Sequence, residues 1–349
     1  MGPAIRNSRL LRPSRQPSIL APASPGGFLL APMPPPSDHF DGKKFFNPGD
    51  KSGHGFLDLI KWKMTSRAAP WPAHVAVAPA FLPPAPASGG VAATWVGHST
   101  FLLRSATAAV LTDPVFSDRA SPVSWAGPRR AMPPGVPFEA VPKVALVLLS
   151  HDHFDHCDLP TFRRLAQRDD PLVLAPLGHR ALLEGAGIRR VVELDWWESH
   201  ACAPGLEATL VPARHWCRRS PFSTNSRLWG GYMLRSGGRR IYFAGDSGYQ
   251  QGLFTAIGSR CGAPDLALIP IGAYEPRWFM KDAHMNPAEA VQVHRDVGAR
   301  RSLAMHWGTF QLTDEAREEP LRALESARAL AGLRPGEFEA LDPGSTVTV

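Results

Sequence analysis

Six consecutive residues, numbered 151–156, combine three histidines with two aspartates in the order His-Asp-His-Phe-Asp-His. They follow the apolar run 144–150, which is continuous and too short for a helix of its own and therefore predicts a buried strand. Side chains at the end of such a strand are held by the sheet and project into a loop. Imidazole and carboxylate groups together suit zinc, iron or manganese, and the lack of cysteine argues against a closed structural zinc site. A solvated polar loop is the alternative interpretation.

Three more strand-like runs end in a residue that can bind a metal ion. His215, Asp246 and His306 each follow a short apolar run, and Gly245 and Gly248 leave room beside Asp246 for close backbone approach. A single histidine in such a place is more often a core residue, but the recurrence favours a site. A dinuclear centre needs roughly three ligands per metal and a bridge, and the series supplies them.

The order of these residues resembles the ligand series of the metallo-β-lactamase superfamily. Further blocks are similar to the N-acylphosphatidylethanolamine-hydrolysing phospholipase D family and occur in the same order, namely Trp95–Thr100, Leu111–Pro114, Glu193–Glu198, His215–Arg218, Phe243–Tyr249, Ile269–Met280 and Met305–Phe310. The resemblance covers residue 40 to the C-terminus, and the twelve residues of Ile269–Met280 are far more specific than the ligand motif. Phe154 stands where the vertebrate enzymes have a tyrosine, and the flank of His284 differs, so substrate contacts are expected to differ.

The resemblance implies an α/β fold of the metallo-β-lactamase type, an αββα sandwich in which helices cover both outer sides of two packed sheets. The metals would lie at one edge between the sheets. One metal ion would be held by His151, His153 and His215, and the other by Asp155, His156 and His306, with Asp246 as the bridge. Two Zn²⁺ ions are expected, with iron or manganese as alternatives.

The resemblance also assigns roles around the metals. Asp113 would orient a metal-bound imidazole, although an aspartate before a proline also commonly starts a turn. His284 would donate a proton to the leaving group or bind phosphate, and His98 either lies near the site or makes a structural hydrogen bond. Aromatic residues would line an acyl groove or fill the core, namely Trp216, Trp278 and Phe279, together with Trp196 and Trp197.

The activity that the resemblance implies is hydrolysis of N-acylphosphatidylethanolamine-like phospholipids to N-acylethanolamine and phosphatidic acid. Two cations that share one water lower its pKa enough to give a hydroxide that attacks phosphorus. A hydrolase of the same fold acting on a lactone, a cyclic phosphodiester or a small phosphodiester is the alternative. Nucleic-acid binding is a third hypothesis, which the scattered basic residues and the lack of an aromatic-basic motif disfavour.

Composition predicts three parts in the chain of 349 residues: a disordered basic Pro/Ala-rich tail at 1–37, an N-terminal extension at 38–90 and a catalytic domain at 91–349. The tail carries four arginines and no acid, so it supplies four of the net +7 charges and leaves about +3 on the rest. No apolar run reaches the roughly 18 residues of a membrane span. The four cysteines are expected to be reduced. We expect a cytoplasmic protein acting on phospholipid at the inner membrane surface, as a monomer or a homodimer.

Periodicity places the remaining elements. Two or three strands are expected within 91–112, and helices at 159–167, 287–297 and 316–331, with Pro287 in a first helical turn. Further strands are expected at 207–213, 228–234 and 239–245. An amphipathic helix at 56–64 carries apolar residues on one face beside two lysines, and this stripe either packs on the domain or faces lipid. If it faces lipid, Leu57, Ile60 and Trp62 are expected to contribute to the contact.

Overall fold

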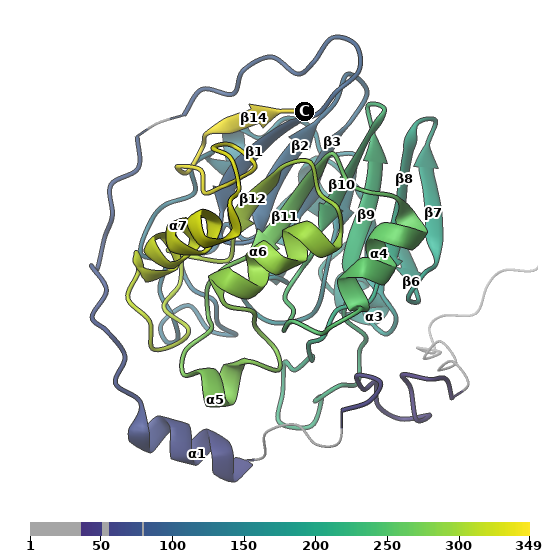
Figure 1. Cartoon of the computed structure of the whole chain (residues 1–349). Helices are drawn as coiled ribbons and strands as arrows, with labels where there is room; N and C mark the ends of the chain where they lie inside the picture. Colours follow the sequence, from purple (N-terminus) through teal and green to yellow (C-terminus); the bar gives the residue numbers. More distant parts are fainter. Residues whose placement is uncertain (1–35, 51–55, 79) are drawn as a thin grey trace, which may run out of the picture. The chain divides into compact units, whose positions relative to one another are not determined.

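Two mixed sheets of seven strands each form the centre of the fold (Figure 1). The computed structural model describes residues 36–50, 56–78 and 80–349, so the predicted tail at 1–37 lies almost entirely outside the described residues. In spatial order the first sheet contains β14 (Thr346–Thr348), β1 (Ala92–Gly97), β2 (Thr100–Arg104), β3 (Ala109–Thr112), β4 (Leu146–Leu148), β5 (Leu172–Pro176) and β6 (Arg190–Leu194). The second contains β13 (Phe338–Glu339), β12 (Ser302–Met305), β11 (Leu266–Pro270), β10 (Arg239–Phe243), β9 (Gly231–Ser236), β8 (Leu206–Val211) and β7 (Ser199–Ala203).

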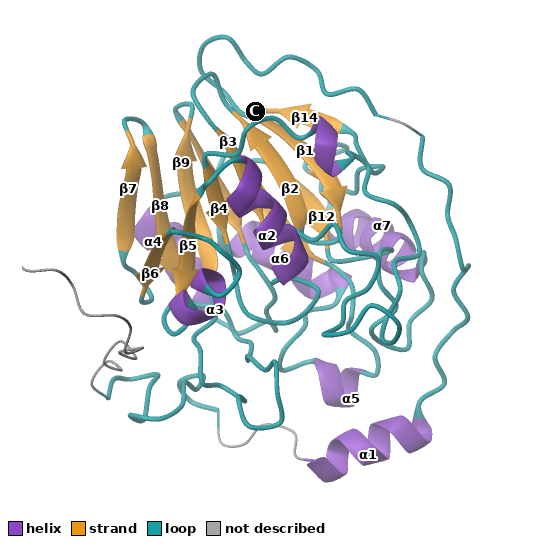
Figure 2. Cartoon of the chain, turned by 180° about the vertical axis from the view of Figure 1, so that it is seen from behind, coloured by secondary structure: helices purple, strands orange, loops and turns teal. Residues whose placement is uncertain are grey.

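Helices cover the outer faces of both sheets. Helices α4 (Leu253–Cys261), α6 (Pro287–Asp296) and α7 (Glu319–Ala331) lie over the second sheet in Figure 1. Helices α2 (Leu159–Arg168) and α3 (Arg180–Glu184) lie over the first sheet in Figure 2. Two short helices, α1 (Phe56–Thr65) and α5 (Arg277–Met280), lie near each other beyond the ends of the strands. This arrangement confirms the predicted αββα sandwich.

Side-chain alternation along the first sheet divides the core into layers. In β4, Leu146 and Leu148 join the core shared with the second sheet, whereas Val147 points to the layer beneath α2. In β5, Leu174 and Val173 divide in the same way. Because successive residues of a strand face opposite sides, a continuous apolar run is what a strand buried on both faces requires.

Several strands are shorter than the sequence predicts, because their ends are held by other partners. The run 144–150 forms a ladder only at Leu146–Leu148, since the Ser150 amide donates to the Asp113 carboxylate instead of to a neighbouring strand. The run 228–234 enters its strand only at residue 231, because the Gly230 amide donates to the Ser150 carbonyl. In both places the backbone leaves the sheet to build the site. The predicted helices are confirmed, and α6 begins with a capping box between Asn286 and Glu289.

The extension at 38–90 contributes to the core instead of only preceding it. Phe40 and Phe45 are each 1% exposed and belong to the core between the sheets. Trp62 in α1 is buried, stacks on Phe279 at a centroid distance of 5.1 Å and donates its indole hydrogen to Asp314. Among the helices that the structure describes, none is long and apolar enough to cross a membrane.

Candidate metal centre

The predicted ligands come from the ends of strands in both sheets. β3 and β4 run parallel in the first sheet, and β8, β10 and β12 point the same way in the second. Their carboxyl ends therefore meet at one edge of the sandwich, where the chain places Asp113, His151, His215, Asp246 and His306. The glycine beside Asp246 is required there, because a Cβ on Gly245, whose φ is +61°, would lie 2.8 Å from the Ser150 side chain.

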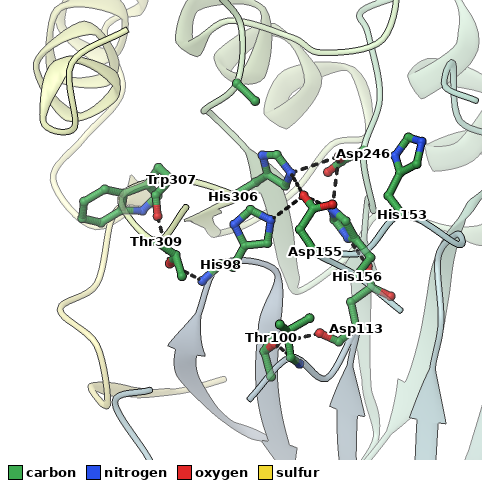
Figure 3. Close-up of polar contacts among 12 residues, drawn as sticks. His98, Thr100, Asp113, His153, Asp155, His156, Asp246, His306, Trp307 and Thr309 are labelled. Atoms are coloured by element: carbon green, nitrogen blue, oxygen red, sulfur yellow. Dashed lines mark hydrogen bonds and ion pairs between the residues drawn. The ribbon is translucent and has the colours of Figure 1, made fainter. Parts of the chain in front are cut away.

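The predicted ligands form two groups. In the first, Nε2 of His151 lies 2.9 Å from Nδ1 of His153, which lies 3.3 Å from Nε2 of His215. In the second, one oxygen of Asp155 lies 3.4 Å from Nε2 of both His156 and His306 (Figure 3). Each group thus brings three potential ligand atoms to one place.

Asp246 lies between the two groups. Its Oδ2 is 3.0 Å from Nε2 of His306 and 3.2 Å from Nε2 of His156. The same oxygen is 4.0 Å from Nε2 of His151 and 3.9 Å from Nε2 of His215. One carboxylate oxygen within 4.0 Å of ring nitrogens from both groups is the position that a bridging ligand would occupy.

Buried atoms without hydrogen-bond partners show that this cluster fits cations. Nε2 of His156, Nε2 of His306 and Oδ1 of Asp246 have no hydrogen-bond partner within the described part of the chain. A buried polar atom without a partner lowers the stability of the fold, so such a set of atoms usually binds something. Because the atoms are ring nitrogens and a carboxylate oxygen, divalent metal ions are the species that suit them.

The buried carboxylates of the second group and of Asp246 are stabilised by positive charge. Burial alone would raise the pKa of Asp246, but the charges of His156 and His306 hold it well below the ordinary value of 3.8. Burial alone would lower the pKa of His306, but the two facing carboxylates raise it to about 9. Protons on these imidazoles thus balance the buried carboxylates, which is the role that cations take when they bind.

In the first group, the pKa values of His151 and His215 are lowered instead of raised. Burial, together with the neighbouring imidazoles, lowers the pKa of His151 well below the ordinary 6.5. Burial also lowers the pKa of His215 well below that value, although Asp246 opposes the effect. Both rings are therefore neutral near pH 7, and a neutral imidazole has the free lone pair that a metal ligand needs.

Asp113 orients one of the candidate ligands. Its buried Oδ2 accepts a hydrogen bond from Nδ1 of His156 at 2.6 Å, which directs Nε2 of that ring toward the cluster. The Ser150 amide and hydroxyl donate to the same carboxylate at 2.7 and 2.5 Å. The role of Asp113 in orienting a metal-bound imidazole stays a prediction, and this is the contact it would use, because metal-binding histidines commonly donate their second nitrogen to a carboxylate.

His98 lies against the second group and not in a distant structural position. Its Nε2 is 3.0 Å from Oδ2 of Asp155, and its ring centroid lies 4.1 Å from that of His306 (Figure 3). The Thr309 hydroxyl accepts from the His98 amide, and the His98 carbonyl accepts from the His306 amide. His98, His306 and Asp113 all have positive φ angles (51°, 60° and 30°), a strained backbone that clusters at functional sites.

His284 lies at the side of the cluster that the first group forms. Its Nδ1 is 3.8 Å from Oδ2 of Asp246, and the residue is held from behind by Arg277, which donates to the His284 carbonyl. Arg277 in turn forms an ion pair with Glu289 at 2.9 Å. The structure therefore places the predicted catalytic histidine next to the predicted bridge.

Comparisons with known proteins bear on this geometry. A model of the β-lactamase superfamily domain matches residues 108–307. N-acyl-phosphatidylethanolamine-hydrolyzing phospholipase D 1 of Caenorhabditis elegans is 41% identical over 268 residues, which cover 73% of this chain and 75% of the relative. This chain belongs to the N-acyl-phosphatidylethanolamine-hydrolyzing phospholipase D family of the β-lactamase superfamily.

Two further matches agree with that placement in the phospholipase D family. The mitochondrial N-acyl-phosphatidylethanolamine-hydrolyzing phospholipase D of Saccharomyces cerevisiae is 37% identical over 246 residues, or 69% of this chain and 52% of the relative. Igni18, a metallo hydrolase from the archaeon Ignicoccus hospitalis, has a TM-score of 0.55 and 24% identity over 74% of this chain and 98% of that structure, which supports the fold. The predicted fold is thus confirmed, and the chain is a metal-dependent hydrolase.

The predicted aromatic contacts of this phospholipase D family member lie in two places. Trp216 is 37% exposed, and its ring meets that of His153 edge-on at 4.5 Å, beside the first group. Trp278 and Phe279 lie on α5, where Trp278 is 37% exposed and faces Lys61 of α1 at 4.7 Å. The first position adjoins the metal cluster, whereas the second adjoins the helix of the extension.

Sequence reasoning missed two arginines that hold the loop 151–157. Arg219 donates to the carbonyls of Asp152 and Cys157 at 2.7 and 2.8 Å and packs over Phe154 at 4.1 Å. Arg227 forms an ion pair with the fully buried Asp152 carboxylate at 2.8 Å. Asp152 belongs to the six-residue motif, but the two arginines lie in an irregular loop without any pattern.

Proposed function

We propose that this chain hydrolyses N-acylphosphatidylethanolamine-like phospholipids to N-acylethanolamine and phosphatidic acid. The observation that carries the proposal is the combination of 41% identity to an N-acyl-phosphatidylethanolamine-hydrolyzing phospholipase D with a buried site in which the seven candidate ligands lie close together. Water adds to phosphorus, the bond from phosphorus to the ethanolamine oxygen breaks, and that oxygen takes a proton.

The two groups of ligands would hold two divalent cations, for which we propose zinc. His151, His153 and His215 would hold one, and Asp155, His156 and His306 the other, with Asp246 between them. Two bound cations would activate a water at neutral pH and neutralise the negative charge of the phosphodiester, which otherwise repels an incoming nucleophile.

The remaining residues of the site orient the ligands and handle the leaving group. Asp113 keeps Nε2 of His156 directed at the cluster through its hydrogen bond to Nδ1. His284, 3.8 Å from Asp246, is placed to donate a proton to the departing alkoxide or to bind a phosphoryl oxygen. Arg277 holds the backbone of His284 and so fixes its distance from the cluster.

We further propose that the enzyme works at a phospholipid surface. Leu57, Ile60 and Met64 have the spacing of one helical face and are 79%, 39% and 81% exposed on α1. We call these three residues the α1 stripe. Lys61 and Lys63 flank it, which suits anionic headgroups, and the partly exposed Trp278 next to Lys61 adds to the exposed apolar surface. The cytoplasmic location and the homodimer stay predictions.

The decisive experiment is product identification. Purified protein loaded with zinc is incubated with vesicles containing an N-acylphosphatidylethanolamine in water labelled with heavy oxygen. We expect N-acylethanolamine without label and phosphatidic acid that carries it, because attack at phosphorus leaves the label on phosphate. Turnover of a lactone or a cyclic phosphodiester without any lipid product would contradict the proposal and favour the alternative hydrolase.

A further inference from the structure

Residues 39–50 of the extension form a segment that we call the strap. It is anchored in the core, since Phe40 and Phe45 are each 1% exposed and their rings lie 4.5 Å apart. His39 is 2.7 Å from the Asp195 carboxylate and stacks on Trp196 at 4.3 Å. The strap is therefore fixed to the body of the protein before it reaches the loop that carries His215.

The second half of the strap binds that loop directly. The Phe45 amide donates to the Asn225 carbonyl at 2.8 Å, and the Asn225 amide donates to the Cys217 carbonyl at 2.8 Å. Cys217 lies two residues beyond His215 and is fully buried. The strap thus supports one side of the loop through its backbone.

Asn47 contacts the candidate ligand itself. Its side-chain amide donates to the His215 carbonyl at 3.0 Å, and its Oδ1 accepts from the indole of Trp229 at 3.2 Å. Trp229 is 1% exposed, and its indole also donates to the Ala213 carbonyl at 2.9 Å. The amide of Asn47 therefore connects the backbone of His215 to a rigid core side chain.

The other side of the loop is held by charge. Arg214 precedes His215 and lies 2.9 Å from a carboxylate oxygen of Asp50 in the strap and of Asp282 in the loop after α5. In that same loop, the Ala283 carbonyl is 2.9 Å from Nδ1 of His215. Because a carbonyl only accepts, Nδ1 carries the hydrogen, and the lone pair of Nε2 is left free toward the cluster.

We infer that Asn47 is a positioning residue that fixes the backbone of His215, so that the strap is a working part of the first metal site. The ring of His215 has its tautomer set by Ala283, but its distance from His153 depends on where the backbone lies. Asn47 holds that backbone through the carbonyl of the ligand itself. The inference rests on the metal ligands of the proposed function and not on its substrate.

Metal binding by variants of the full chain tests the inference. Zinc content is measured by equilibrium dialysis over a range of buffered free zinc, and cobalt-loaded protein is followed by its visible absorption spectrum. Asn47→Asp is the key variant, because it has the same shape and still accepts from Trp229 but cannot donate to the His215 carbonyl. We expect binding of one of the two metal ions to weaken about tenfold, at the lower end of losses for residues behind a ligand.

Three comparisons make the result specific. Asn47→Ala should weaken the same metal ion, whereas Asp41→Ala should leave both unchanged. Asp41 lies in the same strap and also makes two hydrogen bonds, to the amides of Lys43 and Lys44, but it does not contact the loop of His215. His215→Ala should lose one metal ion, and the cobalt spectrum of Asn47→Asp should change toward that of His215→Ala.

The outcomes distinguish an error in the proposed ligand set from an error in the role of Asn47. If His215→Ala keeps both metal ions at full affinity, the proposed ligand set is wrong. If His215→Ala loses one metal ion but Asn47→Asp binds both as the unchanged protein does, only the role of Asn47 is overturned. A lower melting temperature of Asn47→Asp with unchanged metal affinity and an unchanged cobalt spectrum would show a merely structural contact and would also overturn it.

Discussion

Asp246 is the residue that would bridge the two groups of candidate ligands. It is the one predicted ligand whose carboxylate oxygen lies within 4.0 Å of a ring nitrogen from each group. A ligand that belongs to one group affects one metal ion when it is removed, whereas a bridge affects both. The consequences of losing Asp246 should therefore differ from those of losing His215.

Replacement of Asp246 by alanine should remove most of the bound metal and nearly all activity. Metal analysis of the unchanged protein should give about two equivalents per chain, and the variant should fall below about one. His215→Ala provides the matched comparison, with loss restricted to one metal ion. Full activity of Asp246→Ala on the lipid substrate would contradict the assignment of the bridge.

The predicted ligands could be found in the sequence because each is a histidine or an aspartate at the end of an apolar run. That pattern reports residue type and position together, and strand ends of the same direction meet at one edge of a sheet. Asn47, Arg219 and Arg227 could not be found in this way. Their hydrogen bonds are made from irregular segments, and an isolated polar residue in a loop has no periodicity to mark it.

At the scale of elements, the sequence predicts the helix of the extension, but it does not show which of the apolar side chains on that helix are buried and which are exposed. The residues predicted from the sequence for lipid contact are Leu57, Ile60 and Trp62. In the structure Trp62 is 7% exposed and packs on Phe279, while Leu57, Ile60 and Met64 form the exposed α1 stripe. Indole is large and apolar enough to serve either face, so its packing partner decides, and that partner is distant in sequence.

Replacement of the three α1 stripe residues by serine should weaken binding to phospholipid vesicles. Apolar side chains that enter a lipid interface contribute about 0.8 kcal/mol per buried CH₂, so a loss of roughly tenfold or more in vesicle binding is expected. Hydrolysis of a short-chain soluble diester should be unchanged. Leu330→Ser is the control, because Leu330 is 91% exposed on α7, away from this stripe.

The same experiment distinguishes lipid contact from ordinary packing. Trp62→Ser should lower the melting temperature and impair hydrolysis of both substrates, because the indole packs on α5 and bonds Asp314. If the serine variant of the α1 stripe behaves like Trp62→Ser, with equal losses on vesicle and soluble substrates, the stripe stabilises the fold and does not contact lipid.

For the whole molecule, the fold followed from the pattern of buried runs and from the family resemblance, but several pairings did not. β14 closes the first sheet beside β1, and its three residues Thr346–Thr348 are too few for any pattern to predict. β13 has two residues, which are also too few for a pattern. Whether such short edge segments form strands depends on the neighbouring strand that they pair with, so the sequence alone does not predict them.

The strap ties the extension to the sandwich through a titratable group, so the stability of the molecule should depend on pH there. Burial alone would lower the pKa of His39, but hydrogen bonds with Asp195 and Asp38 and their charges raise it above the ordinary 6.5. A group whose pKa is higher in the folded than in the unfolded state stabilises the fold fully below the unfolded value. That contribution is then lost as the pH rises above 6.5 and through the folded pKa.

Replacement of His39 by glutamine should therefore lower the melting temperature at pH 6 more than at pH 9. The comparison is the difference between the variant and the unchanged protein at each pH, since groups common to both cancel. His200→Gln is the control, because His200 lies on β7, outside the strap. A difference between the His39 variant and the unchanged protein that stays constant from pH 6 to pH 9 would show that His39 acts through stacking on Trp196 and not through its charge.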